Sequence, residues 1–252
     1  MDRSISYSDL RAFLKCPKLF HDRMTRGWQP PTPNEAVSNA LHAIAQHRGD
    51  MVAAKRQVDQ QLKMLSEADR AAAEAELAER APKIAAMVRL EDPNAIREKV
   101  FRWLDQESGW TLCAKPDRVR FIGEGRHRLL EITDYKDAVK YNKKRRGQLY
   151  FFALVLSRAL EHNGKIKLVV NPFARQGEES QPLDVFHYSH WLSDPELRKI
   201  RGQLARIEEY MAGQFPATPD WFCSGCPLAD TCQEGRDHQE RANGRQPLLQ
   251  IA

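Results

Sequence analysis

Residues 116–136 read PDRVRFIGEGRHRLLEITDYK, and this stretch decides the fold. It spans parts of two strand-like runs, residues 111–122 and residues 128–136. The turn residues Gly123-Glu124-Gly125 separate the two runs. Runs of β-branched and aromatic residues on either side of a glycine-rich turn are typical of a β-hairpin. We therefore predict that the two runs pair as neighbouring strands.

The second of these strands places polar groups beside apolar ones on a single face. Leu130 and Ile132 mark a buried face, and residues two apart share a face, so Asp134 and Lys136 belong to it. With an even number of residues in the loop between paired positions, Asp117 on the first strand joins them. Two buried carboxylates repel each other unless a cation lies between them. We therefore expect Asp117 and Asp134 to bind Mg²⁺ or Mn²⁺, with the ammonium of Lys136 beside the ion.

This set of side chains suits the hydrolysis of a phosphodiester bond. A divalent ion lowers the pKa of bound water and stabilises the charge that develops on phosphorus, and a lysine can orient the attacking water. The alternative is a half-exposed strand with an Asp–Lys surface pair and an unrelated aspartate. Glu98 and Glu131 are also acidic and close to this site, but Glu131 falls on the opposite face of its strand.

Helices and further strands surround the predicted hairpin. Apolar spacing and helix-stop signals predict helices over 8–20, 34–90, 143–162 and 194–211. The region 34–90 is Ala-rich and is read as consecutive helices that Pro82 interrupts. Further strands are predicted over 99–104, 165–170 and 183–188. This order predicts an α/β fold with four segments: an N-terminal helix (1–33), a helical region (34–92), the sheet-bearing core (93–213) and a Cys-rich tail (214–252).

The composition bounds the class of protein. With 42% hydrophobic and 29% charged residues, the chain of 252 residues fits a globular protein that needs no disulfide scaffold. Its longest apolar run, residues 151–156, is far shorter than the ~20 residues of a membrane span, and its polar N-terminus does not resemble a signal peptide. A cytoplasmic location with no membrane partner is therefore expected. The net charge of +5 favours a polyanionic partner, although weakly.

The pair Pro116-Asp117, followed by Asp134-x-Lys136 at the end of an apolar strand, resembles the signature of the PD-(D/E)XK nuclease superfamily. In the RecB-like branch of this superfamily an upstream helix carries a metal-binding histidine, and His42 occupies that place here. The same branch has a Q-x3-Y motif in the helix that follows the lysine. Here Gln148 begins this motif, and Phe152 stands at the tyrosine position.

This resemblance implies a restriction-endonuclease-like core, a small mixed sheet flanked by helices, with a helical insertion. It also implies the roles of the site residues. Asp117 and Asp134 would bind the metal, His42 would add a nitrogen ligand that favours Mn²⁺, Lys136 would position or activate water, and Gln148 would orient these groups or the substrate.

Four of the five cysteines form a second pattern, Cys16 near the start of the sequence and Cys223-x2-Cys226-x5-Cys232 near its end. Thiolates bind zinc or an iron–sulfur cluster, and unrelated reduced thiols are the alternative in a cytoplasmic protein. The pattern resembles that of the AddB-type and CRISPR-associated ("Cas-four") exonucleases. This resemblance implies a [4Fe-4S] cluster that the four cysteines bind and that joins the two ends of the chain. Cys113 is expected to be a buried thiol.

Basic residues crowd the start of the helix that carries Gln148, namely Lys140, Lys143, Lys144, Arg145 and Arg146. Cations at a helix N-terminus oppose the macrodipole, so contact with DNA phosphates is one explanation and a solvated basic face is the other. Arg118 and Arg120 are expected to extend this patch. Trp110, Tyr135 and Tyr141 are either base-stacking residues or core residues.

These features together predict a metal-dependent DNA exonuclease that shortens single-stranded ends. The settings implied are recombination and repair, CRISPR adaptation or phage DNA metabolism. The chain has no G-x4-G-K-[ST] motif, so unwinding would come from a helicase or a CRISPR-adaptation partner. Two alternatives stay open: a DNA-end-binding factor that does not cut, and a zinc-stabilised nucleic-acid-binding protein with an inactive nuclease site.

Overall fold

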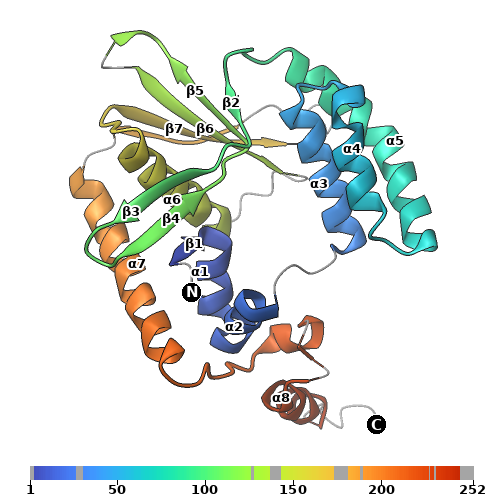
Figure 1. Cartoon of the computed structure of the whole chain (residues 1–252), viewed down its shortest axis with the longest axis vertical. Coiled ribbons are helices and arrows are strands. Elements are labelled where there is room, and N and C mark those ends of the chain that lie inside the picture. Colours follow the sequence, from blue (N-terminus) through green and yellow to red (C-terminus); the bar gives the residue numbers. More distant parts are fainter. Residues whose placement is uncertain are drawn as a thin grey trace, which may run out of the picture. The chain divides into compact units, whose positions relative to one another are not determined.

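The protein has a mixed α/β fold with small sheets and surrounding helices (Figure 1). This computed structural model describes residues 3–26, 31–125, 128–136, 143–172, 181–187, 190–226, 228–229 and 231–244. The chain divides into two compact units. The larger unit comprises Met1–Ser4 and Gln29–Leu197, and the smaller one comprises Ile5–Trp28 and Arg198–Ala252.

A five-stranded mixed sheet forms the centre of the larger unit, with the strand order β2-β5-β6-β7-β8. Its strands are β2 (Ile96–Arg97), β5 (Arg118–Ile122), β6 (Leu129–Lys136), β7 (Lys165–Pro172) and β8 (Gln181–His187). The predicted hairpin is confirmed, because β5 and β6 are antiparallel neighbours, with Val119 opposite Ile132. β6 and β7 are parallel, and the helix α6 (Lys143–Ala159) lies between them in the chain, as a parallel connection requires.

The predicted single strand over residues 111–122 is wrong, because the chain changes sheets within it. β4 (Trp110–Ala114) pairs with β3 (Phe101–Asp105) in a second, smaller sheet, whereas β5 belongs to the main sheet. Pro116 lies at the break, and it has no N–H group with which to continue a strand ladder. As a result, Asp117 lies where the chain leaves one sheet and enters the other.

The helix α6 forms much of the core of the larger unit. It packs against β3 and β4 of the smaller sheet and against β6 and β7 of the main sheet. Leu149 and residues 151–157 are all buried, which explains why this helix is apolar around most of its circumference. Even so, none of the helices in the described part of the chain is long and apolar enough to cross a membrane.

Three helices form a separate layer of the larger unit, α3 (Pro33–Gln46), α4 (Met51–Leu62) and α5 (Glu67–Arg89) (Figure 1). They share a core of mostly Ala, Val, Leu and Ile side chains, which also includes Tyr135 of β6. The predicted interruption at Pro82 is wrong, since Pro82 lies inside α5. A proline within a helix costs about 3 kcal/mol, and the burial of Ala81, Ile84 and Ala85 around it offsets this cost.

A network of charged side chains on the sheet includes Arg118 and Arg120. It corrects the expectation that these two residues extend a phosphate-binding patch. Arg118 is buried and forms ion pairs with Glu91 (2.9 Å) and Glu131 (3.0 Å), and Arg120 pairs with Glu131 (2.5 Å). Lys167 is the third cation on Glu131. Although burial raises it, hydrogen bonds from Arg120 and Lys167 hold the pKa of Glu131 below its usual value. Arg118 is therefore held inside the fold by two carboxylates, and Arg120 is held by Glu131, so these side chains bind acidic partners of the protein itself instead of forming the expected phosphate patch.

Tyr135 and Trp110 are core residues, with exposed fractions of 1% and 2%. The hydroxyl of Tyr135 donates to Glu91 and accepts from Arg97. Burial and then the charge of Glu91 raise the pKa of this hydroxyl. Base stacking by these two aromatic residues is thereby excluded, while Tyr141 lies outside the described residues.

The smaller unit combines segments from both ends of the sequence. It contains most of β1 (Ser4–Ser6), the helices α1 (Tyr7–Lys15) and α2 (Pro17–Arg26), the later part of α7 (His190–Met211), the 3₁₀ turn η2 (Trp221–Gly225) and α8 (Gln233–Gly244). The sequence predicts one short helix within 8–20, with a break at Cys16-Pro17. The break is confirmed, but a second helix follows it, because Cys16 is extended and Pro17 begins α2. The rings of Phe13, Phe20, Tyr210 and Phe215 pack together and hold these segments in one core.

Two glycines allow a test of how tightly the helical layer packs. Gly49 has φ +76°, and a Cβ atom there would lie 2.6 Å from the carbonyl oxygen of Ala85 in α5. Gly123 in the hairpin turn has φ +85° with nothing within 4 Å. We expect Gly123→Ala to cost about 1–3 kcal/mol through its backbone alone, and Gly49→Ala to cost about 1–3 kcal/mol more through the clash. Urea denaturation measures the free energy of unfolding of both variants. Equal losses of stability would contradict the close packing of Gly49 against Ala85.

Candidate metal centres

Three potential metal ligands from three segments meet in the larger unit. The Nδ1 atom of His42, on α3, lies 3.1 Å from Oε1 of Glu98 and 3.3 Å from Oδ1 of Asp117. In the described part of the chain, His42, Glu98 and Asp117 are the one group of three or more His, Cys, Asp or Glu residues whose ligand atoms all lie within 4.8 Å of one another. One imidazole and two carboxylates are a donor set that suits Mn²⁺ or Mg²⁺.

The strand pairing explains how these residues meet. β2 is antiparallel to β5, with Arg97 opposite Arg118, so the next pair of positions is Glu98 and Asp117. The backbone N–H of Glu98 donates to the carbonyl of Asp117 at 3.2 Å and extends the ladder by one step. Glu98 received no role from the sequence because β2 has two residues, too few for a detectable strand pattern. In the sequence, the one sign of a role for Glu98 in the site was that it is acidic and close to the predicted ligands.

Asp134 occupies the position next to Asp117 on the neighbouring strand. Arg118 is opposite Thr133 in the β5–β6 register, so the following positions on the two strands are Asp117 and Asp134. The backbone N–H of Tyr135 donates to Oδ2 of Asp117, and Asp134 is 1% exposed. Asp134 is outside the described group of three converging ligands. That Asp117 and Asp134 share one ion stays a prediction.

The remaining predicted site residues are only partly described. Lys136 ends β6 opposite Pro172, but its side chain lies outside the described residues, as do Lys140 and the side chains of Lys143, Lys144 and Arg145. Gln148 is half-buried on α6, and Arg146 is exposed with its guanidinium 5.6 Å from the ring centre of Tyr150. Phe152, at the tyrosine position of the motif, is buried.

The charge of His42 shows what this centre stabilises. Burial lowers the pKa of His42, but its hydrogen bonds to Asp117 and Glu98 outweigh burial and raise the pKa to about 10. In the metal-free protein His42 is therefore charged at neutral pH and lies between two carboxylates. Protonated His42 thus places a positive charge between the carboxylates of Glu98 and Asp117. A metal ion bound by these three side chains would supply that positive charge instead.

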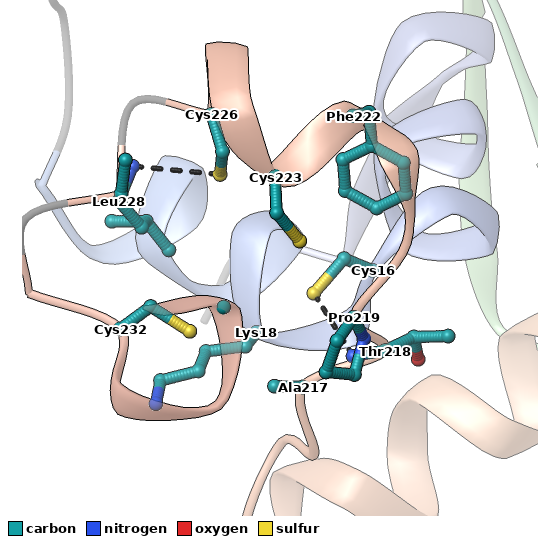
Figure 2. A pocket seen from close by; sticks show the side chains of 12 residues that line it. Cys16, Lys18, Ala217, Thr218, Pro219, Phe222, Cys223, Cys226, Leu228 and Cys232 are labelled. Carbon is teal, nitrogen blue, oxygen red and sulfur yellow. Dashed lines mark hydrogen bonds between the residues drawn. The ribbon is translucent and has the colours of Figure 1, made fainter. Parts of the chain in front are cut away.

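The four predicted cysteine ligands line one cavity of the smaller unit (Figure 2). The cavity is small and partly open to solvent. Cys16 follows α1, Cys223 lies in η2, Cys226 follows that turn, and Cys232 precedes α8. Cys113, the fifth cysteine, is half-buried in β4 and belongs to the other unit. The structure thus separates the four thiols of the pattern from the one left over.

Backbone N–H groups point at the sulfur atoms of this cavity. Thr218 donates to Cys16 (3.4 Å), Asp220 donates to Cys223 (3.3 Å) and Leu228 donates to Cys226 (3.5 Å). Burial raises the pKa of the Cys232 thiol, which donates to Glu234 at 3.5 Å. N–H donors stabilise a thiolate more than a thiol, because the thiolate carries the charge. The surroundings of Cys16, Cys223 and Cys226 therefore fit thiolates that bind a metal or an iron–sulfur cluster, whereas the contact of Cys232 with Glu234 favours its thiol form.

The pKa of His42 predicts how the metal-free protein responds to pH. A folded-state pKa of about 10 lies above the ordinary value of 6.5, so the stabilisation is complete below pH 6.5 and is lost as the pH rises through 10. We expect the free energy of unfolding, measured by urea denaturation in EDTA, to fall between pH 7 and pH 10. The variant His42→Gln should show a smaller fall over this range. The same pH dependence in both proteins would refute the assignment.

Comparisons with known proteins agree with this fold. The family model of the PD-(D/E)XK nuclease superfamily matches residues 4–233. Among solved structures, a candidate exonuclease from Eubacterium rectale has a TM-score of 0.55 at 10% identity, covering 99% of this chain and 90% of that one. The structure of SSO0001 has a TM-score of 0.42 at 13% identity, covering 93% and 88% of the two chains. No curated protein sequence matches the chain significantly.

At 10% identity, the likeness to the Eubacterium rectale structure shows a shared fold and nothing more specific. The family match, in contrast, spans most of the sequence, including the histidine, both aspartates, the lysine and all four cysteines of the two predicted sites. The chain belongs to the PD-(D/E)XK nuclease superfamily.

Proposed function

We propose that this protein is a DNA exonuclease that uses Mn²⁺ or Mg²⁺ to hydrolyse phosphodiester bonds at single-stranded ends. The observation that carries the proposal is the convergence of His42 and Asp117 next to the strand that bears Asp134 and Lys136, in a chain of a nuclease superfamily. The exonuclease assignment is also supported by the name of the solved Eubacterium rectale structure.

In this proposal the protein prepares the site for the ion and the water. When bound, the ion supplies Lewis acidity toward phosphate and acidifies a water molecule. His42, Asp117 and Asp134 would hold it. The N–H of Tyr135 donates to the carboxylate of Asp117 and fixes its position.

Two further residues would act on the substrate side. Lys136 would hold the attacking water or balance charge on the scissile phosphate, and Gln148 would orient the substrate or the groups around the ion. Arg146 is exposed near the start of α6 and would contact the DNA backbone without reading its sequence. A separate helicase or an adaptation complex would supply the single-stranded end.

We also propose that Cys16, Cys223, Cys226 and Cys232 bind a [4Fe-4S] cluster. Tetrahedral zinc, at about 2.3 Å from each sulfur, needs sulfur atoms about 3.8 Å apart. No three thiols of the described chain gather within 4.8 Å of one another, so their positions do not match one tetrahedral zinc ion. A cluster here would close a loop of roughly 200 residues, and its binding free energy would become part of the stability of the smaller unit.

The catalytic proposal predicts the effect of removing Lys136. Lys136→Ala should lower the rate of cleavage of end-labelled single-stranded DNA at least 100-fold, because proton transfer and charge balance at the scissile phosphate are lost. Gel analysis with Mn²⁺ or Mg²⁺ measures this rate on single- and double-stranded substrates. Lys83→Ala, on the exposed side of α5, serves as the matched control.

Equal cutting by the wild type and Lys136→Ala would exclude Lys136 as a catalytic residue. DNA binding without cleavage by the wild type would instead support the end-binding factor and sink the nuclease proposal.

The cluster proposal predicts a coloured protein after anaerobic purification. We expect about four iron and four sulfide per chain, and we expect Cys16→Ser to lose most of both. Cys113→Ser should retain them, since Cys113 lies in the other unit. A colourless protein with one zinc per chain would overturn the cluster and favour the zinc-stabilised alternative.

A further inference from the structure

Glu91 is a nearly buried carboxylate that the proposed reaction does not use. It follows α5 in the chain, and its side chain is 9% exposed. It accepts from the guanidinium of Arg97 at 2.7 Å, from the guanidinium of Arg118 at 2.9 Å and from the hydroxyl of Tyr135 at 2.7 Å. One carboxylate at the end of the helical layer thus binds three strands of the main sheet, β2, β5 and β6.

The three partners of Glu91 share a property. Each is the immediate neighbour, in the sequence, of an acidic residue that lies in the candidate metal centre or is predicted for it. The pairs are Arg97 with Glu98, Arg118 with Asp117, and Tyr135 with Asp134. Because successive side chains of a strand point to opposite faces, a residue that is held on one face fixes the direction of its neighbour on the other.

A second connection runs from Glu91 to Asp117 through Tyr135. The backbone N–H of Tyr135 donates to Oδ2 of Asp117, while its hydroxyl is held by Glu91 and Arg97. The side chain of Tyr135 is 1% exposed and packs in the core of the helical layer. The other oxygen of Asp117, Oδ1, lies 3.3 Å from Nδ1 of His42. Tyr135 is therefore fixed at both ends, and its N–H orients the carboxylate that faces the histidine.

Stability alone does not account for the burial of these charges. The side chains of Arg97 and Arg118 are 5% and 8% exposed. Removing such groups from water costs about as much free energy as their attraction returns, so buried ion pairs add little to stability. What the pairs supply is direction, because a guanidinium and a carboxylate bind each other in a restricted set of geometries.

We propose that Glu91 is a positioning residue of the metal centre, which acts through the side chains of Arg118 and Tyr135. It directs the neighbouring carboxylates, Asp117 and Asp134, toward one ion. This inference rests on the metal-dependent function proposed above. Glu91 touches neither the ion nor the DNA, and it gives the helical layer a role in the reaction besides packing. Residues that orient metal ligands in this way typically contribute roughly 10–100-fold to metal affinity or activity.

Binding of Mn²⁺ to the full chain without DNA, measured by isothermal titration calorimetry, tests this proposal. Glu91→Gln keeps the size of the side chain but removes its charge, and it should weaken Mn²⁺ binding roughly 10–100-fold. Tyr135→Phe removes only the hydroxyl, leaves the ion pairs in place and should weaken binding about tenfold. At saturating Mn²⁺, Glu91→Gln should lower the kcat of DNA cleavage and leave the KM for DNA unchanged, because the buried carboxylate makes no contact with the substrate.

Two controls separate positioning from a loss of stability. Arg120→Gln removes a cation that binds Glu131 on the same strand, β5, but the neighbours of Arg120 are Val119 and Phe121, so Mn²⁺ affinity should not change. Leu77→Ala makes a cavity in the core of the helical layer and removes no charge. It should lower the thermal unfolding temperature and keep the Mn²⁺ affinity of the wild type.

The outcomes distinguish this proposal from the proposed function. Wild-type Mn²⁺ affinity in folded Glu91→Gln, with DNA cleavage intact in the wild type, would overturn the positioning role and leave the nuclease standing. Losses of affinity in Arg120→Gln or Leu77→Ala as large as in Glu91→Gln would also overturn it, because they would show general destabilisation. If Glu91→Gln does not fold, Tyr135→Phe decides alone, and wild-type affinity in that variant refutes the role. A wild type that binds no Mn²⁺ and cuts no DNA would sink both proposals.

Discussion

The antiparallel register of β5 and β6 is the constraint on which the candidate metal centre depends. Arg118 faces Thr133 in this register, so Asp117 and Asp134 come next to each other at the ends of the two strands. Because side chains alternate along a strand, a slip by one residue would exchange the face of every group. The buried Arg118 next to Asp117 would then point toward the metal site, and Glu91 and Glu131 would each lose one of their cationic partners.

Buried charges on the other side of the sheet oppose such a slip. Glu131 accepts from Arg118, Arg120 and Lys167, and a second carboxylate, Glu91, binds Arg97, Arg118 and the hydroxyl of Tyr135. Buried ion pairs add little net stability because desolvation offsets their attraction, but breaking one is costly. In this protein the network makes alternative registers unfavourable and joins the sheet to the helical layer through Tyr135.

The two candidate centres lie in different units and use different chemistry. Oxygen and imidazole ligands gather at the edge of the main sheet, whereas the four thiols line a cavity in the unit built from both ends of the sequence. Each ligand type matches its proposed occupant, since carboxylates suit hard divalent ions and thiolates suit softer centres. The smaller unit requires residues near both ends of the chain, so anything that binds its four cysteines stabilises a contact between distant segments.

The sequence alone determined the features that depend on local spacing: the hairpin, the helices, the shared face of Leu130, Ile132 and Asp134, and the grouping of four cysteines. Only the tertiary structure decided which distant groups meet. Glu98 reaches His42 and Asp117 through a two-residue strand that leaves no periodic pattern, and Arg118 is neutralised by carboxylates that lie 27 and 13 residues away in the chain. The packing of its neighbours likewise keeps Pro82 within a helix. Periodicity reports which way a side chain points, but the partner it meets is set by strand pairing and packing, which are long-range properties of the fold.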